Sequence, residues 1–345
     1  MAKLLIQRVA IFFLVAVISF ATLGLGTCGA EAGKRLNILT INLMLINPDD
    51  PFDWPTRADT LVSFVQQQEA LGQPVDFILC QEGHGGELAK ILGGSKNTIL
   101  NLKRRLQAAG LNYYAASTVS FQNTQTGGVD IESNFLVGIL SRYPIKTVKR
   151  GKLTCDATTP PEPAIRKGIA CITKVPGIGR VTCFSAHLAD ACGGDRNQGE
   201  QLIAFANSVA KRYPSALYIL GGDFNALPTS DLYSFLTDEI NLIDTFAAAN
   251  VADPGYTFDV PGNPFFDDGS PRRIDYIFAI YGKQNPGIPT EPPLEVLASR
   301  VVLNGTPESG DFMSDHCGVL SQIMVTPPYG GKPIKGIFAP LPESQ

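Results

Sequence analysis

The pattern of hydrophobic and polar positions predicts many short strands and few helices. Alternating or continuous apolar runs of strand length cover residues 36–43, 75–80, 134–140, 145–149, 167–174, 180–187, 216–220, 273–279, 294–303 and 316–325. Apolar residues at helical spacing cover residues 56–71, 97–109, 196–213 and 229–237. Because the strands come largely as antiparallel pairs, we expect two packed sheets with helices outside.

Two of these strand pairs are predicted in detail. Residues 134–140 and 145–149 are expected to pair around Tyr143-Pro144. Residues 167–174 and 180–187 are expected to form a hairpin about Pro176-Gly177. No linker interrupts the middle of the chain, so the pattern predicts one domain over residues 33–325. The tail, residues 326–345, is rich in proline and is expected to be poorly ordered.

The N-terminal segment, residues 1–32, has a different composition. Lys3 and Arg8 precede an apolar run over residues 9–25, and small residues follow. This layout is typical of a secretory signal peptide, here with cleavage after Ala30 or Ala32, so we expect a secreted or periplasmic protein. The run is long enough that an uncleaved membrane anchor is an alternative. Lipidation at Cys28, which ends a loosely lipobox-like stretch, is a second one.

The other cysteines are consistent with export. Without Cys28 there are six, an even number that permits disulfides outside the cytosol: Cys80, Cys155, Cys171, Cys183, Cys192 and Cys317. Cys155 and Cys192 lie in loop-like sequence and are the preferred pair. Cys171 and Cys183 would lie opposite each other in the predicted hairpin. Buried thiols are the alternative for the remaining two.

Composition narrows the class of protein. Hydrophobic residues make up 44% of the chain and charged residues 17%, which suits a globular protein with a sizeable core. The net charge is −4, which argues against a broad basic surface for nucleic acid and leaves a local basic patch open. The small basic clusters at residues 103–105 and 272–273 are best explained as solvated faces.

The stretch GGDFN, Gly221 to Asn225, follows the apolar run over residues 216–220. Its two glycines are expected to end the strand. Asp223 and Asn225 lie two positions apart, so they point to the same side while the chain stays extended. An Asx turn is the alternative explanation, because these residue types favour turns. A functional role is favoured because polar residues end other strands in the same way.

Two of those polar strand ends suggest a metal site. Glu82 is the first charged residue after the strand over residues 75–80, and a carboxylate there needs a partner or a cation. Mg²⁺ takes one or two carboxylates and keeps most of its waters. Asn42 ends the strand over residues 36–43 and offers a carbonyl oxygen. The alternatives are a solvated strand end for Glu82 and a turn residue for Asn42.

Histidines and an acid complete the set of polar strand ends. Of three histidines in the chain, His187 ends a strand and His316 begins one. Asp275 lies inside the apolar strand RIDYIF and therefore needs a partner. His316 is the natural partner, since a carboxylate fixes the tautomer and stabilises the imidazolium, and Arg273 is the competing one. Acids, amides and histidines along one sheet rim, with a hard metal, fit phosphoester hydrolysis.

The ordered set of motifs resembles the endonuclease/exonuclease/phosphatase superfamily, the DNase I-like proteins. The matching elements are Asn42, Gln81-Glu82, SAH at 185–187, GGDFN at 221–225, RIDYIF at 273–278 and SDH at 314–316. They occur in the family's order across residues 36–325. The resemblance implies an α/β fold of the four-layer α/β sandwich type, with two mostly antiparallel packed sheets flanked by helices.

The resemblance also implies roles for the metal and the base. Glu82 would be the principal ligand of Mg²⁺, or of Mn²⁺ or another divalent cation, with Asn42 beside it. His316 would be the general base that activates water, and Asp275 would orient it.

Four further roles follow from the same resemblance. Asp223 and Asn225 would position the nucleophile and stabilise the transition state. His187 would contact the phosphate and help the leaving group. Asp315 would support the metal or the neighbouring base.

The substrate is predicted by a finer resemblance. The segment over residues 187–202, HLADACGGDRNQGEQL, is similar to a stretch of the secreted bacterial neutral sphingomyelinases. It implies a monomeric phospholipase C-type enzyme acting on phospholipid at a membrane surface. An extracellular DNase I-like endonuclease acting on nucleic acid is the alternative, weakly opposed by the acidic charge. A catalytically inactive binding module is the second alternative, opposed by the intact acids and histidines.

Overall fold

The computed structural model describes residues 33–44, 53–85, 97–118, 135–154, 165–190, 196–284, 294–306, 309–326 and 332–333. All of these residues belong to one compact unit that begins at Ala32. Within them the chain forms two six-stranded sheets and a small two-stranded one. The predicted α/β fold is therefore confirmed. Among the helices of the described ranges, none is long and apolar enough to cross a membrane.

The first sheet has the strand order β12-β13-β1-β2-β4-β3. Its strands are β1 (Lys34–Asn42), β2 (Phe77–His84), β3 (Tyr114–Ser117), β4 (Phe135–Ser141), β12 (Leu294–Val302) and β13 (Gly318–Val325). Strands β1 and β2 are parallel, and the other neighbouring pairs are antiparallel. A parallel pair needs a crossover, which here contains helix α1 (Trp54–Ala70).

The second sheet has the strand order β5-β6-β7-β8-β10-β9. Its strands are β5 (Ile145–Thr154), β6 (Ile165–Val175), β7 (Gly179–His187), β8 (Leu217–Asp223), β9 (Ile243–Asp244) and β10 (Asp275–Tyr281). Here β7 and β8 are the parallel pair, joined through helix α4 (Arg196–Arg212). The other neighbours are antiparallel. Each sheet thus contains one strand–helix–strand unit.

The remaining elements are short. They are α3 (Thr98–Ala108), α5 (Asp231–Ser234), the π-helix η3 (Phe235–Glu239), α6 (Thr245–Ala249), β11 (Lys283–Gln284) and β14 (Lys332–Pro333). Strand β14 belongs to the predicted proline-rich tail and pairs with β11.

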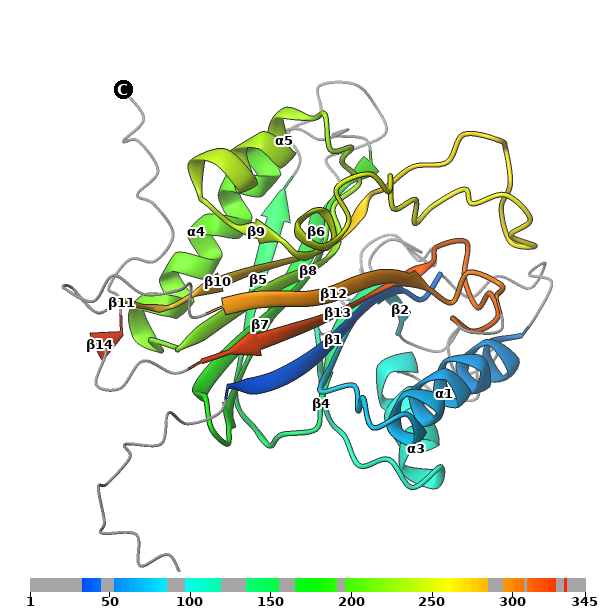
Figure 1. Ribbon diagram of the computed structural model, residues 1–345, viewed down its shortest axis with the longest axis horizontal. Helices are drawn as coiled ribbons and strands as arrows, with labels where there is room; N and C mark the ends of the chain where they lie inside the picture. The colour runs from blue at the N-terminus through cyan, green and yellow to red at the C-terminus, as the bar shows by residue number, and fades with distance from the viewer. Residues whose placement is uncertain are drawn as a thin grey trace, which may run out of the picture. The chain divides into compact units, whose positions relative to one another are not determined.

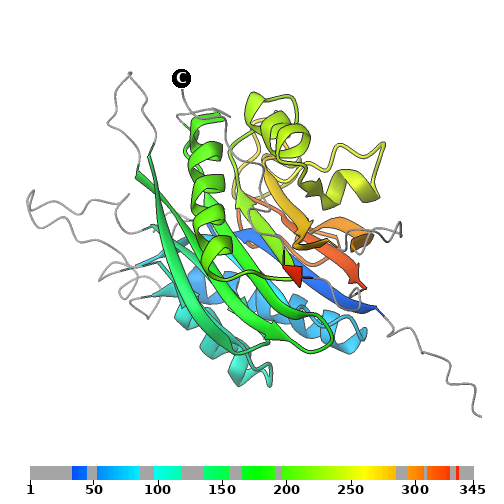
Figure 2. The same cartoon turned by 90° about the vertical axis from the view of Figure 1, so that its left-hand side faces the viewer.

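The sheets and helices form four layers. Figures 1 and 2 show α1 and α3 covering the outer face of the first sheet and α4 and α5 covering the second. Alternation along β1 explains the core, because Leu36 and Ile38 pack between the sheets whereas Leu39 and Ile41 pack under α1 and α3. The two parallel units end at the same rim of this sandwich, so polar residues that follow their strands are brought together.

The predicted pairing of residues 134–140 with 145–149 is wrong. Strand β4 pairs with β2 and β3, whereas β5 pairs with β6 in the other sheet. Both strands contribute apolar side chains to the core between the sheets, Val137 and Ile139 from β4 and Val148 from β5. The chain around Tyr143-Pro144 therefore crosses from one sheet to the other.

The predicted hairpin is confirmed, but its two cysteines do not form a disulfide. Strands β6 and β7 pair, and Cys171 lies directly opposite Cys183. Both are buried free thiols, as are Cys80 and Cys317, so the described residues contain no disulfide. The preferred pair of Cys155 and Cys192 lies outside the described residues.

Candidate active site

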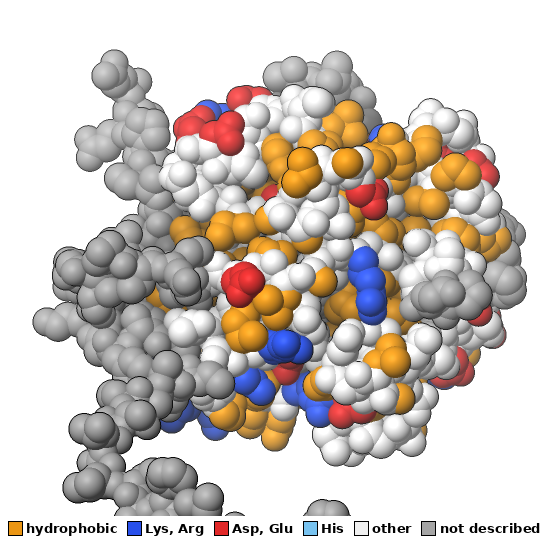
Figure 3. Space-filling view, viewed as in Figure 1, with side chains coloured by type: hydrophobic (Ala, Val, Ile, Leu, Met, Phe, Trp, Pro, Cys, Tyr) orange, Lys and Arg blue, Asp and Glu red, His pale blue; other side chains and the backbone are white. Residues whose placement is uncertain are grey.

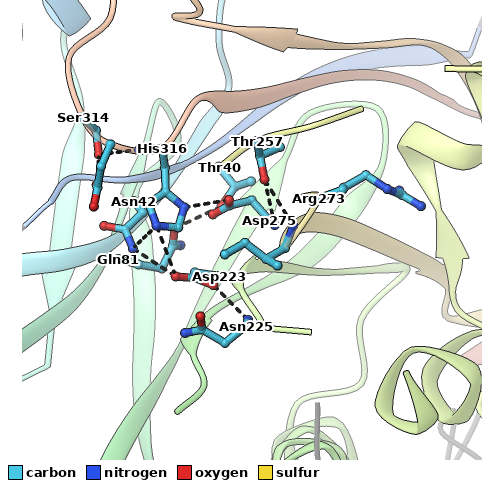
Figure 4. Close-up of polar contacts among 12 residues, drawn as sticks. Thr40, Asn42, Gln81, Asp223, Asn225, Thr257, Arg273, Asp275, Ser314 and His316 are labelled. Carbon is cyan, nitrogen blue, oxygen red and sulfur yellow. Dashed lines mark hydrogen bonds and ion pairs between the residues drawn. The ribbon is translucent and has the colours of Figure 1, made fainter. Parts of the chain in front are cut away.

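Three predicted site residues form one row across the second sheet. His187 at the end of β7 pairs in register with Asp223 on β8, which pairs in turn with Asp275 on β10. Neighbouring strands lie about 4.8 Å apart, so pairing alone places these side chains close together. In the first sheet, Asn42 on β1 lies beside Gln81 on β2. Figure 4 shows Asn42 and Gln81 facing Asp223 and Asp275.

The two glycines of GGDFN allow this close approach. The prediction that these glycines end the strand is wrong, because β8 continues to Asp223. Gly222 has a φ of +150°, and a Cβ there would lie 1.9 Å from the carbonyl oxygen of Ala186 on β7. A Cβ on Gly221 would lie 2.5 Å from a methyl group of Leu79 in the other sheet. Glycine is therefore required where β8 delivers Asp223 to the rim.

His316 and Asp275 form a buried pair. Nδ1 of His316 lies 2.8 Å from Oδ2 of Asp275, and both side chains are at most 5% exposed. The backbone N–H of Asp275 donates to Oγ1 of Thr257 at 3.2 Å. The predicted competitor, Arg273, instead pairs with Asp244 at 2.6 Å.

The charges around His316 favour its protonated form. Burial by itself lowers the pKa of His316, but the carboxylates of Asp275 and Asp223 outweigh it and raise the pKa well above its ordinary value. Nδ1 is engaged by Asp275, so Nε2 is the atom that faces the rest of the cluster. It lies 3.8 Å from Oδ2 of Asp223.

Asn42 joins the two sheets at this point. Its Nδ2 donates to Oε1 of Glu82 at 3.1 Å and to Oδ2 of Asp223 at 3.0 Å, and lies 3.4 Å from Nε2 of His316. Its Oδ1 accepts the backbone N–H of Met44 at 2.9 Å. The amide nitrogen, and not the carbonyl oxygen expected of a metal ligand, therefore faces Glu82.

Glu82, His187 and Asp223 form a group that fits a divalent cation. One ligand atom from each lies within 4.8 Å of the others. Burial and the nearby carboxylate of Asp275 raise the pKa of Asp223 to about 8, which shows that this carboxylate lacks sufficient positive charge around it. Glu82 has a φ of +49° at an irregularity in β2, a conformation that is costly for a non-glycine residue. Two carboxylates and an imidazole are suitable ligands for a divalent cation, and its positive charge would compensate the excess of negative charge at this site.

Asn225 supports His187. Its Nδ2 lies 3.2 Å from Nε2 of His187 and donates to the carbonyl oxygen of Leu188 at 2.9 Å. Its backbone N–H donates to Oδ1 of Asp223 at 2.9 Å, so the Asx turn considered as an alternative also exists. Burial, together with Arg166 and His316, lowers the pKa of His187 well below its ordinary value. His187 is therefore neutral near pH 7.

One predicted residue lies apart from this cluster. The Asp315 carboxylate accepts a hydrogen bond from Oγ of its neighbour Ser314 at 3.0 Å. Among the described residues it forms no hydrogen bond or ion pair with the other predicted site residues, although its charge contributes to the raised pKa of His316. Its effect on the site is thus electrostatic.

Two supporting residues were not given roles from the sequence. Gln81 donates to Oγ of Ser185 at 2.9 Å and so connects the first sheet to the second. Arg57 is 1% exposed and its Nη1 donates to the carbonyl oxygens of Leu43 and Met313 at 2.7 and 3.3 Å. It ties the segment after Asn42 to the segment before His316. In the sequence, the signal for this role is that Arg57 occupies an apolar position of a predicted helix.

An aromatic wall closes one side of the site. The ring of Phe258 lies 4.7 Å from the imidazole of His316 and stacks on Phe266 at 5.0 Å, measured between centroids. The guanidinium of Arg272 lies 4.7 Å from the same ring on Phe258. This wall shields one face of His316 from solvent.

The sequence profile of the endonuclease/exonuclease/phosphatase family matches residues 37–316. The chain therefore belongs to this family, whose members hydrolyse phosphoesters with the help of divalent metal ions. A comparison with curated proteins found no significant match.

Solved structures share the fold. A family protein from Leptotrichia buccalis is 21% identical, with a TM-score of 0.60 over 84% of this chain and 99% of that one. The mannosyl-6-phosphatase of Bacteroides thetaiotaomicron is 17% identical, with a TM-score of 0.58 over 84% and 99%. The catalytic domain of human nocturnin, solved with bound sulfate, is 16% identical, with a TM-score of 0.55 over 85% and 95%.

The metal site can be tested without an activity assay. Millimolar Mg²⁺ or Mn²⁺ should raise the unfolding temperature of the metal-free protein by a few degrees, because a cation bound only by the folded state stabilises it. Glu82→Gln should lose most of that increase, whereas Glu295→Gln, which changes an exposed carboxylate on β12, should keep it. An unchanged increase in Glu82→Gln would place the metal elsewhere. Thermal unfolding by circular dichroism provides the measurement.

Proposed function

We propose that the protein is a Mg²⁺-dependent phosphodiesterase in which His316 activates the attacking water. The observation that carries this proposal is the 2.8 Å contact between Nδ1 of His316 and Asp275, which leaves Nε2 facing the cluster of Asn42 and Asp223. A base with one nitrogen fixed and the other directed at the reacting groups is the arrangement that water activation requires.

The side chains of the cluster and solvent account for each bond and proton in the proposed hydrolysis. Nε2 of the neutral His316 imidazole takes a proton from water as the new bond to phosphorus forms, Asp275 stabilises the resulting imidazolium, and the imidazolium then releases the proton to solvent. Asp223 lies between the two imidazoles, 3.4 Å from Nε2 of His187 and 3.8 Å from that of His316, and positions the water. The phosphorus–oxygen bond to the alcohol breaks, and the alkoxide takes a proton from solvent.

Two further groups stabilise the negative charge on the phosphate. Because the pKa of His187 is depressed, His187 acts as a hydrogen-bond donor to a phosphate oxygen, oriented by Asn225. Asn42, whose Nδ2 donates to Glu82 and Asp223, orients these two carboxylates. A Mg²⁺ ion held by Glu82 with Asp223 or His187 would neutralise charge on the phosphate oxygens.

Replacing the base tests this chemistry. His316→Ala should lower kcat for bis(p-nitrophenyl) phosphate by roughly 10²- to 10⁴-fold, the usual contribution of a general base. Added imidazole should restore part of the lost rate, because it can occupy the space of the missing ring. Full activity in the variant would refute the assignment, as would a loss of rate that accompanies a loss of folded structure by circular dichroism and does not respond to imidazole.

For the substrate, we propose a phospholipid of the sphingomyelin type. Large apolar side chains that remain exposed occur beside the site, including Leu227 two residues after Asn225, Tyr256 and Phe266, which is 38% exposed. Figure 3 shows hydrophobic side chains gathered where the loop before β10 lies. Exposed apolar groups around a catalytic rim suit a substrate that is presented in a membrane.

Parallel assays separate this substrate from the alternative. We expect the Mg²⁺-loaded protein to release phosphocholine from sphingomyelin vesicles and to leave plasmid DNA intact. Phe266→Ala should weaken the activity on vesicles and have little effect on bis(p-nitrophenyl) phosphate. Plasmid nicking without phosphocholine release would instead identify a nuclease.

We further propose that the protein is exported under the direction of residues 1–32. The support is the sequence pattern of two basic residues, an apolar run and small residues before Gly33. N-terminal sequencing of the protein recovered outside the cytoplasm should read from Glu31 or Gly33. Recovery with an intact N-terminus in the membrane fraction would favour the anchor, and recovery in the cytoplasm would refute export.

A further inference from the structure

Positive charge is concentrated on three adjacent strands of the second sheet. Strand β5 carries four lysine and arginine residues, β6 three and β7 one, and none of the three strands contains an acidic residue. The whole chain, by contrast, has a net charge of −4. The acidic balance of the sequence therefore conceals a local excess of positive charge on these three strands.

A cavity of about 490 Å³ lies at one end of these strands. Its lining combines three cations, Lys146, Lys174 and Arg180, with two threonines, Ile172 and Tyr213. The volume is within the range of small-ligand sites. Figure 2 shows α4 lying across the outer face of these strands, and Tyr213 directly follows that helix.

Part of the lining is held in place before any ligand binds. Nη1 of Arg180 donates to the carbonyl oxygen of Pro214 at 2.8 Å. The ring of Tyr213 lies 5.4 Å from Nζ of Lys149 and 5.7 Å from the guanidinium of Arg212. These contacts orient one cation and one aromatic wall of the cavity.

The cations repel one another without local compensation. Lys174 and Arg180 lie directly opposite in the pairing of β6 with β7, and like charges in that position are destabilising. Neither they nor Lys146 forms an ion pair with a carboxylate of the described residues. An anion in the cavity would offset this repulsion.

Protection of a sheet edge is the competing explanation for such lysines. It accounts for Lys146, because β5 is an edge strand. It does not account for Arg180, because β7 is an interior strand, whereas Lys174 lies one residue beyond Thr173, the last residue of β6 that pairs with β5. Protection of the sheet edge therefore does not explain all of the positive charge at the cavity.

We propose that this cavity is a second anion site that binds a phosphate-bearing group, supplied by a soluble phosphoester or by a phospholipid head group. It is separate from the catalytic rim. On β6, Lys174 at the cavity is seven residues from Lys167, which pairs with His187, and this spacing corresponds to about 23 Å along a strand. The site does not depend on the proposed catalytic function.

Titration calorimetry with the full chain tests binding directly. Glycerol 3-phosphate is titrated in EDTA at constant ionic strength, so that metal-dependent binding at the catalytic rim does not contribute. The variant Lys146→Gln/Lys174→Gln removes two exposed cations of the cavity and should weaken binding by roughly tenfold or more. The matched control Lys103→Gln/Arg104→Gln removes two charges from α3 and should bind as the unmodified chain does.

A vesicle assay distinguishes the two sources of phosphate. Sedimentation with phosphatidylcholine vesicles is compared with sedimentation after addition of phosphatidylglycerol, so that any contribution of the apolar N-terminal segment is common to both. If only the phosphatidylglycerol-dependent increment is lost in Lys146→Gln/Lys174→Gln, the ligand is a lipid head group. If glycerol 3-phosphate binding is lost instead, it is a soluble ester.

Three results would overturn the proposal. The first is an unmodified chain that binds neither probe, and the second is an equal loss in the cavity variant and the α3 control. The third is a chain that binds neither phosphate probe but binds single-stranded DNA in a way that depends on Lys146 and Lys174. Unchanged hydrolysis of bis(p-nitrophenyl) phosphate verifies that the cavity variant is folded.

Discussion

Compensation of buried charge at one end of the sandwich is the constraint on which the site depends. Asp223, Asp275, His187 and His316 are each at most 5% exposed, and together they pair, hydrogen-bond and perturb one another. Buried carboxylates are tolerated only with positive charge nearby. Against the lowering effect of burial, the carboxylates of Asp275 and Asp223 raise the pKa of His316, so a proton on His316 supplies positive charge beside them, while burial and Asp275 raise the pKa of Asp223. A divalent cation would replace that proton's charge and leave the imidazole free to act as a base.

The architecture explains why these groups meet. Each sheet contains one parallel pair of strands, β1 with β2 and β7 with β8, and each pair ends at the same rim. The glycines before Asp223 permit the close approach of β8 to β7 and to the other sheet. Arg57 then connects the segments that follow Asn42 and precede His316. The cavity lined by Lys146, Lys174 and Arg180 lies on the second sheet, toward the opposite ends of its strands. The proposed catalytic rim and the proposed anion site therefore lie at opposite ends of this sheet.

Much of this was predictable from the sequence. Strand ends marked by an isolated polar residue located Asn42, Glu82, His187 and Asp223, because the period of a strand and its termination are local properties. Pairing was less predictable, since the chain around Tyr143-Pro144 crosses between sheets and nothing local distinguishes a crossover from a hairpin. The amide orientation of Asn42 depends on Met44 and on two carboxylate acceptors from distant segments, Glu82 and Asp223. The cavity was concealed because its cations come from separate strands of an acidic chain.

Whether Asp275 acts through His316 is measured most directly by a double-mutant cycle on kcat with bis(p-nitrophenyl) phosphate. Asp275→Asn alone should lower the rate by roughly 10²-fold or more, because the imidazolium loses its stabilising carboxylate. In the His316→Ala background the same substitution should have almost no further effect. If the two losses of rate multiply in the double variant, Asp275 contributes independently of His316 and does not act through it.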